Sequence, residues 1–126
     1  MRARAGVLVV EDGCLALVHR RHAGRDYYVV PGGGVDPGET SEEAALREAR
    51  EELGLEVRLD ELAAAFEDDE GPHRYYRATA VGGEFGTGAG LAGEEELFGP
   101  VEVEWVPLER LSQVTVIPKE AVAPLR

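Results

Sequence analysis

The segment PGGGVDPGETSEEAALREAREELGL, which begins at Pro31, joins a glycine-rich loop to a glutamate-rich stretch with helical signals at both ends. Thr40 is a favourable N-cap, and Glu43 three residues later completes a capping box. Gly54 follows Leu53, at a position where glycine commonly ends a helix. The pattern predicts a helix over residues 41–53, directly after a loop whose backbone can approach a ligand closely.

Three carboxylates of this predicted helix share one face. At about 100° per residue, Glu48, Glu51 and Glu52 fall within a sector of about 100°, beside a stripe of alanine and leucine. Like charges at these spacings repel by a few tenths of a kcal/mol per pair, so folding stability alone does not select them. The arrangement suits a hard divalent cation that prefers oxygen ligands, such as Mg²⁺ or Mn²⁺. The alternative is an ordinary solvated acidic surface.

The spacing of the segment resembles a known signature, the Nudix box of the Nudix hydrolases. Every box position is filled over 23 residues, namely Gly33, Glu39, Arg47-Glu48-Ala49, Glu51-Glu52 and Gly54-Leu55. The resemblance implies an α/β fold, a Nudix-type α/β/α sandwich with a central mixed β-sheet. It also implies that residues 1–126 form a single Nudix hydrolase domain.

The resemblance assigns roles to individual box residues. The carboxylates expected to bind the metal are Glu48, Glu51 and Glu52. Gly33 is expected to make a tight turn or to place its carbonyl near the metal. Arg47 is expected to orient a box carboxylate, and Glu39 to support the loop or the metal shell.

The activity that the resemblance implies is hydrolysis of a nucleoside diphosphate linked to another group, with Mg²⁺ or Mn²⁺ as cofactor. The substrate would be a nucleoside triphosphate, an oxidised one included, or a nucleoside diphosphate sugar. Metal ions would neutralise the diphosphate and lower the pKa of the attacking water. Two alternatives are a non-catalytic Nudix module that binds or senses a nucleotide, and an unrelated fold with a structural acidic helix. Degraded box residues typify the first alternative, and none is degraded here.

The general base is left open by the resemblance. Some family members use a box glutamate and others a glutamate on a later loop. Glu52 and the cluster Glu94-Glu95-Glu96 are therefore both candidates, the cluster lying about forty residues beyond the box. We favour metal binding for Glu52, which leaves Glu95 as the catalytic candidate outside the box.

Contacts with the substrate are expected from arginines and tyrosines before and after the box. Arg20, with Arg21 and Arg25 near it, is suited to binding phosphates as a guanidinium fork. Tyr28 and Tyr76 are candidates for stacking on a base, with Tyr75 beside them. The alternatives are surface charge for the arginines and core packing for the aromatic rings.

Composition narrows the partners. The formal charge of −12 disfavours binding to nucleic acid or to an anionic membrane, so the expected partner is a small-molecule nucleotide. No apolar run approaches the roughly 20 residues of a membrane span, and the N-terminus lacks a signal-peptide core, so we expect a cytoplasmic protein. Cys14, His19 and His22 do not make a zinc set, because structural zinc sites usually need four ligands. Relatives in the resembled family include monomers and dimers, which leaves a homodimer open.

The remaining elements are predicted mainly as strands. Residues 6–10 and 14–18 form a predicted hairpin around Asp12-Gly13. Further strands are predicted over 27–30, 62–68 and 74–82 and from Val101 onward, with a loop over 68–73 and a long one over 82–100. Two short helices are predicted near the C-terminus, the second with Pro118 in its first turn.

Overall fold

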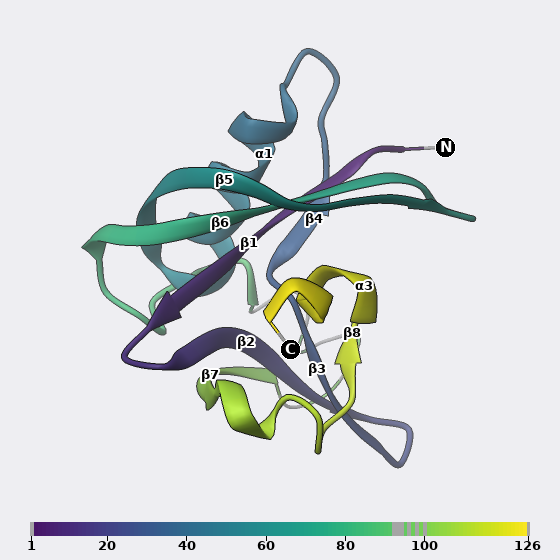
Figure 1. The fold of residues 1–126 in the computed structure, drawn as a ribbon, viewed down its shortest axis with the longest axis vertical. Coiled ribbons are helices and arrows are strands. Elements are labelled where there is room, and N and C mark those ends of the chain that lie inside the picture. The colour runs from purple at the N-terminus through teal and green to yellow at the C-terminus, as the bar shows by residue number, and fades with distance from the viewer. Residues whose placement is uncertain (1, 92–94, 96, 98, 100, 126) are drawn as a thin grey trace.

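The computed structural model describes residues 2–91, 95, 97, 99 and 101–125, and its described part is built on one mixed, curved β-sheet (Figure 1). The strand order is β5-β6-β1-β2-β3-β8, with β4 also paired to β1 and β7 to β2. The strands are β1 (Arg4–Glu11), β2 (Cys14–His22), β3 (Arg25–Val29), β4 (Gly32–Gly34), β5 (Leu55–Asp68), β6 (Gly71–Gly83), β7 (Val101–Pro107) and β8 (Val116–Ile117). The pairs β1–β6 and β3–β8 are parallel and the others antiparallel, so the predicted mixed sheet is confirmed.

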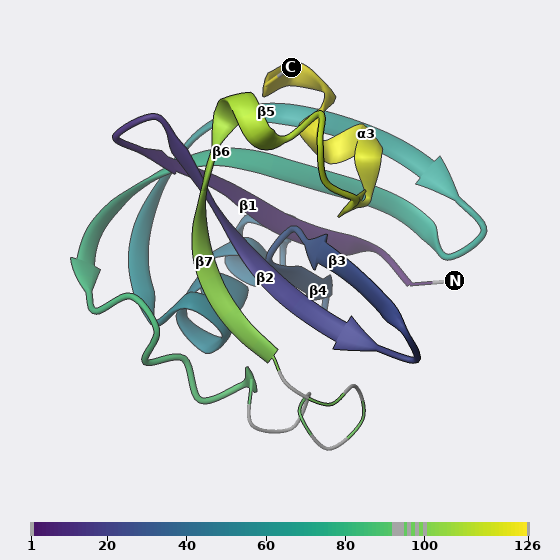
Figure 2. The same ribbon diagram turned by 90° about the horizontal axis from the view of Figure 1, so that it is seen from below.

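The helices lie on opposite sides of this sheet, as Figure 2 shows. One side carries α1 (Ser41–Glu48) and the π-helical segment η1 (Ala49–Leu53), and the other carries α3 (Lys119–Val122) with the 3₁₀ turns η2 (Leu108–Arg110) and η3 (Ala123–Leu125). Each side has its own apolar cluster, because successive strand residues point to opposite faces. The α/β/α sandwich is thereby confirmed. None of the described helices is long and apolar enough to span a membrane.

The predicted hairpin of β1 and β2 is confirmed, and its strands separate soon after the turn. Asp12 and Gly13 have φ angles of 51° and 75°, the left-handed pair that a two-residue hairpin turn requires. Only Val10↔Leu15 and Glu11↔Cys14 pair directly, after which β1 turns to β4 and β6 while β2 turns to β3 and β7. Figure 2 shows the two strands diverging from their common turn. The divergence leaves room between the two halves of the sheet.

The box helix begins as predicted and ends differently. Thr40 Oγ1 accepts a hydrogen bond from the Glu43 amide at 3.0 Å, and Glu43 Oε1 accepts one from the Thr40 amide at 2.9 Å, which confirms the capping box. Gly54 ends the helix with a φ of 76°, as predicted. Residues 49–53 form a π-helical turn in place of the predicted α-helix. Such turns occur frequently at functional sites, and this one changes the angles between the side chains that it carries.

Two strand predictions need correction. β5 begins immediately after the box helix, and only Asp69 and Glu70 separate β5 from β6, so the predicted loop over 68–73 is wrong. The three glycines of β4 form a strand that pairs with β1, although glycine is a poor strand former. A Cβ at Gly32 would lie 2.7 Å from the carbonyl oxygen of Ala5, so only glycine fits this close backbone approach.

We expect Thr40→Ala to lower the free energy of unfolding by about 1 kcal/mol, because it leaves the amide of Glu43 without its cap. Urea unfolding followed by circular dichroism measures the change. Thr115→Ala is the matched control, since Thr115 is exposed and its recorded hydrogen bond uses its backbone carbonyl. Equal losses in the two variants would contradict a stabilising role for the capping box.

Candidate active site

Arg47 joins the loop before the box helix to the helix itself. Its Nε and Nη2 donate to the two carboxylate oxygens of Glu39, both at 2.9 Å, and Nη2 also donates to the Gly34 carbonyl at 2.9 Å. Its Nη1 donates to Glu51 Oε2 at 3.2 Å. Glu39 Oε1 in turn accepts from the Asp36 amide at 2.9 Å. The bidentate ion pair with Glu39 fixes the guanidinium plane, because both hydrogen bonds must form at once.

This pair changes the acidity of both partners. The hydrogen bonds from Arg47 and from the Asp36 amide lower the pKa of Glu39 from 4.5 to about 2. Glu39 in return raises the pKa of Arg47 above its ordinary value. Both groups therefore stay charged throughout the neutral range.

Glu48 and Glu52 are the buried carboxylates of the box, each about 8% exposed. Glu52 Oε1 accepts a hydrogen bond from the Gly32 amide at 2.7 Å. Glu48 packs on Gly33, where an added Cβ would lie 2.2 Å from Glu48 Oε1. The strand β4 thus accommodates both side chains because it has none of its own.

Glu51 differs from the other two box glutamates. Its side chain is 48% exposed and turns toward Arg47, four residues earlier. The sequence predicted that the three carboxylates share one face of the helix. In the structure Glu48 and Glu52 are buried, and Glu51 lies on the solvent side of them. The π-helical turn contributes to this difference, because it holds more residues per turn than an α-helix.

The segment after β6 packs on the end of the box helix. The amides of Gly86 and Gly90 donate to the carbonyls of Leu53 and Glu51 at 2.9 and 2.8 Å. Glu95 is exposed and lines a cavity of about 400 Å³ together with Gly86 and Gly88. Its neighbours Glu94 and Glu96 lie outside the described residues. The segment that leads to Glu95, the candidate base outside the box, therefore begins in contact with the end of the box helix.

A second cavity, of about 290 Å³, lies where β1 and β2 diverge. Its lining includes Arg4 from β1, Arg20 from β2 and Arg25 from β3, together with two carboxylates, Asp68 and Glu70. Arg4 Nε lies 3.8 Å from Glu70 Oε2, so part of the positive charge is already paired. Tyr27 and Tyr75 also line this cavity, and the Arg25 guanidinium lies 5.2 Å from the centre of the Tyr27 ring. Arg20 thus lines this cavity together with two further arginines.

The aromatic residues expected to stack on substrate lie elsewhere. Tyr28 is buried and stacks on His19, and Tyr76 is buried beneath α1 with its hydroxyl donating to Glu42 at 3.3 Å. Side chains alternate between faces along a strand, so each neighbouring tyrosine, Tyr27 or Tyr75, points to the cavity instead. Tyr27 and Tyr75 are themselves only 9% and 3% exposed, so they line the cavity as largely buried side chains.

Three participants in the site were missed by sequence reasoning. They are the backbone amide of Gly32, the backbone carbonyl of Gly34 and the loop residue Asp36, which lies 3.6 Å from Arg47. Backbone groups carry no sequence signal of their own. The run of glycines was the only indication that the backbone comes close here.

Comparison with models of protein families identifies the family of this chain. A family model described as the NUDIX domain matches residues 1–124. The chain belongs to the NUDIX family. The crystal structure of a MutT NUDIX hydrolase from Burkholderia pseudomallei superimposes with a TM-score of 0.71 at 25% identity, covering 98% of this chain and 95% of that one.

Curated relatives in sequence match over shorter stretches. Diphosphoinositol polyphosphate phosphohydrolase 2 of Rattus norvegicus is 41% identical over 66 residues, which cover 52% of this chain and 36% of the relative. Nucleoside triphosphatase NudI of Salmonella heidelberg is 43% identical over 75 residues, which cover 55% of this chain and 53% of the relative. This NUDIX chain thus aligns with about half or less of the length of these relatives.

The Arg47–Glu39 pair gives stability a defined acid dependence. Because the pKa of Glu39 is lower in the folded protein, its contribution is complete above pH 4.5 and is lost as the pH falls toward 2. Glu39→Gln removes this contribution. We expect wild type to lose more stability than the variant between pH 5 and pH 2, as measured by urea unfolding at each pH. Parallel losses in both proteins would show that the pair does not stabilise the fold.

Proposed function

We propose that this NUDIX chain is a divalent-metal-dependent pyrophosphohydrolase that cleaves the phosphoanhydride of a nucleoside diphosphate linked to another group. One observation carries the proposal. Two nearly buried carboxylates, Glu48 and Glu52, meet the backbone of Gly32 and Gly33 beside the Arg47–Glu39 pair. The complete box places these residues, and the packing holds them in one small region.

The charge balance of this region supports a bound cation. Arg47 has four carboxylates within 4 Å, those of Asp36, Glu39, Glu48 and Glu51. Arg2 adds a second positive charge at Asp36, and Glu52 adds a further negative one on the glycine strand. Carboxylates in excess over cations repel each other unless a divalent ion offsets their charge.

The chemistry of the donors fits Mg²⁺ or Mn²⁺. Glu48, Glu51, Glu52 and the glycine carbonyls offer oxygen atoms, the ligands that these hard cations prefer. A side chain at Gly33 would occupy the space in front of Glu48, so the glycine keeps that carboxylate accessible. When bound, the cation would neutralise the diphosphate and activate water for attack on phosphorus.

The protein's own residues orient and support this chemistry. Arg47 donates hydrogen bonds to Glu39 on the loop and to Glu51 on the helix. It therefore fixes the position of the loop relative to the helix and orients the Glu51 carboxylate. The Gly32 amide orients Glu52. A carboxylate already oriented by a hydrogen bond loses less freedom on binding a ligand, which favours a pre-organised site.

Glu95 is our proposed general base. The Gly86 and Gly90 hydrogen bonds tie its segment to the end of the box helix, and Glu95 itself is exposed to solvent. Glu52 is buried and engaged by the Gly32 amide, which suits a ligand better than a base that must exchange protons with water.

The substrate would place its non-reacting part in the cavity lined by the three arginines. Arg20, with Arg4 and Arg25, would contact phosphate or another anionic group, and Tyr27 or Tyr75 would contact a ring. The two relatives named above are a nucleoside triphosphatase and a phosphohydrolase of diphosphoinositol polyphosphates. Both descriptions concern phosphate-rich substrates, which supports a nucleoside triphosphate ahead of a nucleoside diphosphate sugar, whose sugar carries no further phosphate.

We expect Glu48→Gln and Glu52→Gln each to lower Mg²⁺-dependent turnover by about a hundredfold or more, since each removes a ligand charge from the site. Phosphate release measures turnover, and circular dichroism checks that the fold survives. Glu61→Gln, an exposed glutamate on β5, is the matched control and should retain full activity. Full turnover in both box variants would refute the metal-site assignment.

The same assay separates an enzyme from a nucleotide-binding module. The panel would contain nucleoside triphosphates, oxidised ones included, nucleoside diphosphate sugars and a diphosphoinositol polyphosphate, each with Mg²⁺ and with Mn²⁺. Turnover of any member supports the enzyme. Measurable binding without turnover of any member would favour the non-catalytic module.

For the base, we expect Glu95→Gln to lower kcat strongly with little change in KM or in Mg²⁺ affinity, because a base acts in the chemical step. The pH profile of kcat should lose its acidic limb. Glu84→Gln, in the same segment, is the control and should leave kcat unchanged. If Glu95→Gln keeps the wild-type kcat, the role of base returns to Glu52.

A further inference from the structure

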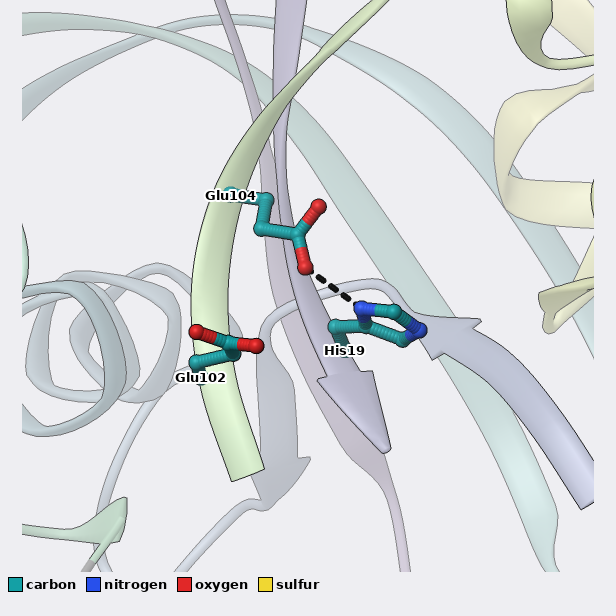
Figure 3. A group of neighbouring side chains, drawn as sticks. All are labelled: His19, Glu102 and Glu104. Carbon is teal, nitrogen blue, oxygen red and sulfur yellow. Dashed lines mark hydrogen bonds and ion pairs between the residues drawn. The ribbon is translucent and has the colours of Figure 1, made fainter. Parts of the chain in front are cut away.

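A second group of metal-ligating side chains lies outside the box, on the pair β2–β7. His19 is the direct cross-strand partner of Glu102, and Glu104 lies two residues farther along β7 on the same face. Candidate ligand atoms of the three residues all lie within 4.8 Å of one another. Figure 3 shows the imidazole of His19 and both carboxylates turned toward a common space. In the described part of the chain, no other three His, Cys, Asp or Glu residues come together in this way.

The histidine of this group is rigidly held. His19 is only 5% exposed, and its ring stacks on Tyr28 with the ring centres 4.2 Å apart. Its Nε2 lies 2.5 Å from Asp26 Oδ1, and its Nδ1 contacts Glu104 Oε2. An ionised carboxylate accepts hydrogen bonds and cannot donate them, so the contact with Asp26 places a proton on Nε2.

This placement of the proton determines what Nδ1 can do. In a neutral imidazole with the proton on Nε2, the Nδ1 lone pair faces the carboxylate of Glu104. Two acceptors in contact need a cation or a second proton between them. A histidine that ligates a metal through one nitrogen and donates to a carboxylate through the other is the usual arrangement in metal sites.

Arg21 supplies a positive charge to this space. Its Nη1 donates to Glu102 Oε1 at 3.2 Å, and its Nη2 lies 3.3 Å from His19 Nδ1. The side chain is 48% exposed, so it can turn out to solvent. A divalent cation and this guanidinium would therefore compete for the same two partners.

We propose that His19, Glu102 and Glu104 bind a divalent transition-metal cation of the Zn²⁺ class, with Asp26 orienting the histidine. One imidazole nitrogen and two carboxylates are a ligand set that Zn²⁺ accepts, with a fourth position left to solvent. Mg²⁺ is disfavoured because it prefers oxygen ligands alone. The site would tie β2, β3 and β7 together and uses none of the box residues.

Zn²⁺ titration by calorimetry tests the site in a protein that carries Glu48→Gln and Glu52→Gln, so that binding at the box is suppressed. We expect one Zn²⁺ per chain, with Mg²⁺ binding at least roughly a hundredfold more weakly. Glu104→Gln and Glu102→Gln should each weaken Zn²⁺ binding by about tenfold or more. Glu102 is exposed, so its variant keeps the test valid if the other disturbs folding.

Arg21→Gln should change the Zn²⁺ affinity in the direction opposite to the two glutamate substitutions. It removes the competing cation and should tighten Zn²⁺ binding, an effect that a merely structural role of the cluster would not produce. His22→Gln, an exposed histidine on the same strand, is the control and should not change the affinity. The proposal is overturned if no Zn²⁺ binds, if both glutamate variants keep the original affinity, or if Arg21→Gln weakens binding.

Discussion

The two-pronged ion pair between Arg47 and Glu39 is the contact on which the arrangement of the box depends. It connects the loop after β4 with the box helix, and a third hydrogen bond from Arg47 reaches the Gly34 carbonyl at the end of β4. With the strand and the helix held at this separation, Glu48 reaches Gly33 and Glu52 reaches Gly32. Longer side chains on β4 would push the helix away, so the glycines and the arginine act as one unit.

The divergence of β1 and β2 gives the molecule a cavity lined by three arginines. The strands pair at only two positions and then join different neighbours, which leaves this cavity between the halves of the sheet. β1 and β3 line this cavity, and β4, which carries the box glycines, pairs with β1 and follows β3 after a short connection.

Much of the fold could be predicted from local patterns, and the failures have physical causes. The hairpin at Asp12-Gly13 and the cap at Thr40 depend on residues close in sequence, and both are confirmed. The strand of three glycines was missed because its pairing with β1 arises from tertiary contact rather than propensity. The sequence left open which tyrosine of Tyr27-Tyr28 and of Tyr75-Tyr76 lines the cavity. Neighbouring strand residues face opposite sides of the sheet, and both members of each pair are tyrosine.

By itself the sequence determined the box, its capped helix and membership of the NUDIX family, because spacing and caps act over a few residues. Only the tertiary structure decided that Glu48 and Glu52 are buried while Glu51 faces solvent, because β4 packs against the first two and not against Glu51. It also decided which tyrosines line the cavity. His19 meets Glu104 across 85 positions of the chain, a distance over which pattern carries no information and strand pairing alone sets the contact.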